Sequence, residues 1–124
     1  MKLTNQATLC VSSESLTATE IAHRLNLVAS RIAEPKGENL DWRFFLDCDL
    51  DEEQSIEVHI GYICSLLDAK KEVIGNLPND VAISIWCTVD SAGEFAGISL
   101  DAKLLSRVAS IPADLIFSVY AGST

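Results

Sequence analysis

Residues 81–89 read VAISIWCTV and form the strongest β-strand pattern in the 124-residue chain. Successive side chains of a strand point to opposite faces, so odd-numbered positions share one face and even-numbered positions the other. The odd-numbered positions are all apolar: Val81, Ile83, Ile85, Cys87 and Val89. The even-numbered positions are Ala82, Ser84, Trp86 and Thr88. The alternation predicts a sheet with one face packed against helices and a second face that carries Trp86. The second face is either a binding surface or is covered within the chain by the first helix or a loop.

Three further strands are predicted from the same kind of alternation, over residues 7–13 (ATLCVSS), 40–46 (LDWRFFL) and 115–120 (LIFSVY). Residues 90–93 (DSAG) predict a turn, after which residues 94–98 return as the antiparallel partner of a hairpin. The alternation assigns several side chains to the face of Trp86, namely Phe45, Arg43, Ile116, Ser118 and Tyr120, which Thr8, Cys10 and Ser12 could join.

Three helices are predicted between these strands. The first begins at a capping box formed by Thr17 and Glu20 and ends at Asn26, because Asn tolerates the left-handed conformation that often closes a helix. The second runs from about residue 53 to 74, with apolar residues at steps of three, four and seven. The third is capped by Asp101 and ends before Pro112. Residues 28–39 are predicted to be an irregular connection, since they contain Pro and Gly.

The predicted order of elements is β-α-β-α-β-β-α-β within one domain over residues 1–124. Three amphipathic helices and one mostly antiparallel sheet predict an α+β, two-layer sandwich. The last six elements match the ferredoxin-like β-α-β-β-α-β pattern. The sequence therefore predicts a ferredoxin-like core preceded by an extra β-α unit.

The charge of the chain restricts its partners. Eighteen acidic and nine basic residues give a formal net charge of −9. Such a surface repels nucleic-acid phosphates and anionic lipids, so neither nucleic acid nor a membrane is an expected partner. The charge either serves solubility alone or, if it has a functional meaning, favours a basic protein partner. The start of the sequence lacks the continuous apolar run of a signal peptide, and we expect a cytoplasmic protein.

Titratable residues give no catalytic or metal-binding pattern. No CxxC occurs, and the four cysteines are expected to be buried structural thiols: Cys10, Cys48, Cys64 and Cys87. His23 and His59 lie on different predicted helices without a metal ligand at short spacing, and we expect surface or boundary positions for them. The sequence predicts no catalytic residues and no cofactor.

The acidic residues 47, 49 and 51 alternate as in a calcium-binding loop. A loop that began at Asp47 would place Glu52 where Gly is needed and Val58 where a bidentate Glu is needed. The pattern favours an acidic, solvated helix start over a calcium site.

Short motifs spread over nearly the whole chain resemble a bacterial family known as domain-of-unknown-function family 4279. They are EIAHRLNL (residues 20–27), KGE (residues 36–38), Trp42, and GISLDAKLLSRVASI (residues 97–111) followed by LIFSVY. Asn26 and Ala29 stand where the family pattern has Gly and Pro, and both differences concern backbone geometry. The resemblance implies a small cytosolic α/β protein and assigns no activity to it.

Two functions remain open from the sequence, and a binding role is favoured over catalysis. The first is a protein-protein interaction module, either immunity- or inhibitor-like or a homodimer, that uses the aromatic face of Trp86, Phe45, Tyr120 and Arg43. The second is a small-molecule or anion-binding domain, with an enzymatic role included, that uses the basic 24–43 region through Arg24, Arg31 and Lys36.

Overall fold

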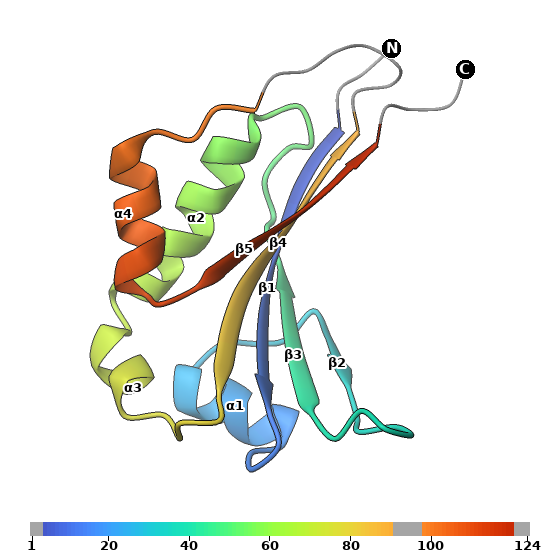
Figure 1. The fold of residues 1–124 in the computed structure, drawn as a ribbon. Coiled ribbons are helices and arrows are strands. Elements are labelled where there is room, and N and C mark those ends of the chain that lie inside the picture. The colour runs from blue at the N-terminus through green and yellow to red at the C-terminus, as the bar shows by residue number, and fades with distance from the viewer. Residues whose placement is uncertain (1–3, 91–97, 121–124) are drawn as a thin grey trace.

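The computed structural model describes residues 4–90 and 98–120 (Figure 1). This part of the chain forms a mixed α+β fold with one five-stranded sheet and four helices. The strands are β1 (Thr4–Ser13), β2 (Arg31–Ala33), β3 (Trp42–Asp47), β4 (Ala82–Asp90) and β5 (Asp114–Tyr120). The helices are α1 (Ala18–Leu25), α2 (Ile56–Asp68), α3 (Lys71–Gly75) and α4 (Ala102–Ser110).

The strand order in the sheet is β2-β3-β1-β4-β5. β1 pairs antiparallel with both β3 and β4, and β2 pairs antiparallel with β3. β5 pairs parallel with β4, and α4 lies between these two strands in the chain. The prediction of a mostly antiparallel sheet is confirmed.

The strand pairing differs from the ferredoxin-like prediction. A ferredoxin-like unit places its first and last strands, here β3 and β5, side by side. The structure separates them by β1 and β4, because β1 lies in the centre of the sheet and pairs along both of its edges. Residues 94–97 of the predicted hairpin lie outside the described residues, and Ile98 is not in a strand.

Two predicted segments have a different local structure. The helix expected over residues 53–74 begins later, at Ile56, after the cap at Ser55. It is also divided into α2 and α3, because the backbone leaves helical geometry at Lys70. The spacing of the apolar residues gives no sign of this break, because Ile74 still packs against the core seven residues after Leu67. The connection expected over residues 28–39 contains β2, whose three residues pair with β3 before Pro35.

The predicted ends of two helices are confirmed. Thr17 and Glu20 form the capping box of α1, with each side chain accepting from the other residue's backbone N–H. Asn26 closes α1 in the left-handed conformation, at φ 53°. The Asp101 side chain caps α4 by accepting from the Leu104 N–H at 2.7 Å.

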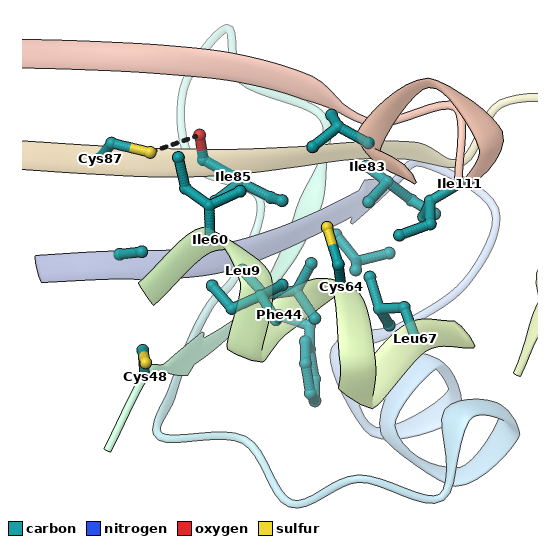
Figure 2. Close-up of a cluster of buried hydrophobic side chains, with 14 of the residues drawn as sticks. Leu9, Phe44, Cys48, Ile60, Cys64, Leu67, Ile83, Ile85, Cys87 and Ile111 are labelled. Atoms are coloured by element: carbon teal, nitrogen blue, oxygen red, sulfur yellow. Dashed lines mark hydrogen bonds between the residues drawn. The ribbon is translucent and has the colours of Figure 1, made fainter. Parts of the chain in front are cut away.

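The core lies between the helices and one face of the sheet. Figure 2 shows a cluster of its side chains from α2 and the strands, among them Leu9, Phe44, Ile60, Cys64, Leu67 and Ile85. Helix α1 contributes Ile21 and Leu25, and α4 contributes Leu104 and Val108. This helix-side face corresponds to the apolar set that the alternation in residues 81–89 predicts. No helix in residues 4–90 and 98–120 is long and apolar enough to cross a membrane.

The open face of the sheet as a candidate binding site

The face of the sheet opposite the core, here called the open face, is assembled from all five strands. The strand register places one row of side chains across it: Asp47 of β3, Thr8 of β1, Trp86 of β4 and Ile116 of β5. The neighbouring row begins with Arg31 of β2, Phe45 of β3 and Cys10 of β1. Arg43 and Tyr120 are in register positions of the same parity. The four residues predicted for this face, Trp86, Phe45, Tyr120 and Arg43, therefore share it.

The exposure of these four side chains differs. Trp86 is 37% exposed and Tyr120 is 56% exposed, whereas Arg43 is half-buried and Phe45 is only 8% exposed. Ile116, which follows Trp86 in the row, is 46% exposed. Within the described residues, Trp86 and Ile116 thus present neighbouring apolar surface to solvent at adjacent strands of the open face.

Phe45 is buried by its neighbours on the open face rather than by a helix. The Arg31 guanidinium carbon lies 4.7 Å from the centre of the Phe45 ring, within the range of a cation–π contact. On the other side, the Trp86 ring meets Phe45 edge-on, with 5.7 Å between ring centres and 76° between planes. The Trp86 indole Nε1–H donates to Ser84 Oγ at 2.9 Å. These contacts fix the orientation of Trp86 and satisfy its polar atom within the chain.

A polar network continues this arrangement toward β2. Arg31 Nη1 donates to both carboxylate oxygens of Asp47, at 3.0 and 2.9 Å. Thr8 Oγ1 donates to Asp47 Oδ1 at 2.8 Å. The Arg31 and Asp47 side chains are both partly exposed, so this ion pair contributes little to stability, and its effect is to hold Arg31 over Phe45.

The basic residues of the alternative site lie in separate elements. Arg24 is on the exposed side of α1, Arg31 is in β2, and Lys36 is in the turn that its backbone closes with Asn39. The guanidinium of Arg31 is already bound to Asp47 and stacked on Phe45. In the part of the chain that the structure describes, these three bases therefore lie on separate elements, and Arg31 already has an acidic partner.

The four cysteines are buried and free, which confirms the prediction of structural thiols. Burial raises the pKa of each thiol, and it raises the pKa of Cys87 to about 12. Cys10 is on the open face, but its neighbours cover it and its pKa is raised by desolvation despite nearby Arg43. A raised pKa keeps a thiol protonated and unreactive, so these cysteines lack the properties of a nucleophile.

One prediction about the histidines is wrong. His23 is exposed as expected, but His59 is buried, with 1% of its surface exposed. Because α2 begins at Ile56, position 59 falls on the buried side of that helix, beside Ile60. His59 Nε2 lies 3.0 Å from the Asp51 carbonyl oxygen. In the described part of the chain, no three His, Cys, Asp or Glu side chains are grouped so that they could hold a metal ion.

The contacts of Arg31 with this face have no signal in the sequence. They depend on the pairing of Arg31 with Phe45 through β2, a strand of three residues that is too short to show an alternating pattern. The alternation predicts the face of Ile116 correctly, but the position of Ile116 next to Trp86 follows only from the parallel pairing of β4 and β5.

Comparisons with known proteins identify the family of the chain. Neither a curated protein nor a solved structure matches the sequence. A family model described as domain of unknown function (DUF4279) matches residues 2–122. This match confirms the resemblance seen in the sequence motifs and covers nearly the whole chain. The chain belongs to the family defined by this domain of unknown function, DUF4279.

Proposed function

We propose that this chain is a protein-protein interaction module that binds a basic partner protein on the open face. The observation that carries the proposal is the adjacent placement of Trp86 and Ile116, at 37% and 46% exposure, on the side of the sheet away from the core. Aromatic side chains supply much of the binding energy at protein interfaces when a partner removes them from water.

The contacts of Trp86 favour binding because they organise it in advance. The Phe45 ring and Ser84 Oγ restrict the indole, and Arg31 holds Phe45 from the other side. A side chain that is already ordered loses less conformational entropy when a partner covers it. The open face therefore offers a rigid apolar centre with Arg43 and the Arg31–Asp47 pair beside it.

The expected chemistry of the partner follows from charge. The chain has a net charge of −9, which attracts a basic protein over a distance and raises its rate of encounter. An apolar segment of that partner would cover Trp86 and Ile116. The proposal includes an inhibitor- or immunity-like role in a bacterial cytoplasm, a reducing compartment that is consistent with four free thiols.

The proposal predicts that Trp86→Ala strongly weakens capture of the partner. Removing a central aromatic side chain typically costs about 2 kcal/mol or more, a loss of affinity of about thirtyfold. The measurement is quantitative affinity capture with the full chain as bait, followed by titration of the purified partner. Binding should also weaken as salt is added, because the attraction between the two proteins is then screened.

The matched control is Leu105→Ala. Leu105 is on α4 and is 45% exposed, so this variant removes a similar amount of exposed apolar surface from the helix side of the molecule. It should capture the partner as the wild-type chain does. The proposal is wrong if Trp86→Ala retains every partner at wild-type affinity while its thermal unfolding shows an intact fold.

A further inference from the structure

The two edges of the sheet are built differently. The β2 edge is three residues long and contains Arg31, and a short, charged edge resists pairing with another chain. The β5 edge is seven residues long and reads DLIFSVY, with no Lys, Arg or Pro. Figure 1 shows β5 as the outermost strand beside β4, and no other strand of the described residues pairs with its outer edge. Within residues 4–90 and 98–120, the outer edge of β5 from Asp114 to Val119 thus has no strand paired with it.

β5 also exposes apolar side chains on both of its faces. Ile116 is 46% exposed on the open face, and Val119 is 59% exposed on the helix-side face. Leu115 and Phe117, on the same side as Val119, pack against the core. Val119 therefore extends beyond the part of β5 that the core covers, and a strand added at this edge would shield it.

The charge pattern of β5 fits a second copy of this chain. Two copies with a net charge of −9 each repel one another, so they can meet only where the surface carries no charge. Residues 115–120 contain no charged side chain. In an antiparallel pair centred on Phe117, Leu115 lies opposite Val119 and Ile116 lies opposite Ser118. Asp114 then lies opposite Tyr120 of the second copy, so no two acidic side chains face each other.

We propose that the β5 edge pairs antiparallel with the β5 edge of a second copy, which joins two sheets into one continuous sheet. Antiparallel pairing of identical strands is self-complementary, as a two-fold symmetric dimer requires. The two-fold axis is perpendicular to the sheet, so the open faces of both copies lie on the same side. The dimer goes beyond the proposed binding function, since it uses backbone groups of β5 and not Trp86.

The test measures the mass of the full chain in solution over a range of concentrations by sedimentation equilibrium. The wild-type chain should reach twice the monomer mass. Val119→Lys should raise the dissociation constant of the dimer by about tenfold or more, because lysine on an edge strand opposes strand addition. Leu105→Lys places the same charge at an exposed position on α4, and this variant should keep the mass of the wild-type dimer. A wild-type monomer up to its solubility limit overturns the proposal.

A second measurement protects the test against misfolding of the Val119→Lys variant. Those backbone amides of residues 115–119 that point away from β4 should exchange hydrogen more slowly as the concentration of the wild-type chain rises, while the amides of β2 should not change. Exchange that is independent of concentration contradicts pairing at β5. Trp86→Ala should keep the dimer mass, so loss of partner capture by that variant and loss of dimerisation by Val119→Lys report on separate proposals.

Discussion

Replacing Phe44 by alanine is expected to lower the free energy of unfolding by about 3–5 kcal/mol, the usual cost of removing a buried aromatic side chain. Phe44 is fully buried on the helix-side face of β3 and belongs to the core cluster that also contains Leu9 (Figure 2). Alanine would leave a cavity that the surrounding strands and helices can fill only in part. Urea unfolding followed by circular dichroism measures this loss.

The matched control lies on the other face of the sheet. Ile116→Ala removes a side chain that is already 46% exposed, so its cost should be about 1 kcal/mol. A large difference between the two variants follows from a sheet that is packed on one face only. Equal losses would mean that the open face is covered within the folded chain, contrary to this account.

The Cys87 thiol is expected to react at least about a thousandfold more slowly than a free thiol at neutral pH. Its pKa is about 12 against a usual 9.0, and only the thiolate form reacts, so its reactive fraction falls by about this factor. Burial on the helix-side face of β4 slows the reaction further. Labelling with a disulfide reagent, followed by peptide mapping, measures the rate, and all four cysteines should react at once in denaturant.

The same shift in pKa gives the fold a sensitivity to alkaline pH. Below pH 9 both the folded and unfolded chains keep the Cys87 proton, so this thiol does not affect their balance. Between pH 9 and about 12 the unfolded chain releases the proton more readily than the folded chain, and stability should fall. Cys87→Ala should show a shallower fall over this range. Labelling of native Cys87 at the rate of a free thiol would disagree with its position in the core.

Short-range patterns in the sequence predict much of this fold. Alternation places Trp86 and Phe45 on one face and Phe44 and Ile85 on the other, because the period of a strand is two residues whatever its neighbours are. The capping box of Thr17 and Glu20 is equally local, since both partners lie within one helical turn. The predictions of these features are confirmed because the causes of each feature lie within a few residues of one another.

Long-range pairing could not be predicted in the same way. The insertion of β1 between β3 and β4 depends on the packing of the whole sheet, and the ferredoxin-like pattern was wrong for that reason. The candidate site shares this limit. Arg31 contacts Asp47 and Phe45 only because β2 pairs with β3, so the support that orders Trp86 was visible only in the structure.

The central claim is that the open face around Trp86 binds another protein. The most direct test replaces Trp86 by the photoreactive amino acid p-benzoylphenylalanine, which keeps an aromatic ring at that position, and irradiates cells that contain the full chain. The account predicts a covalent product with a basic partner protein from position 86, and none from the same replacement at Leu105 on α4. Equal products from both positions, or none from position 86, would contradict it.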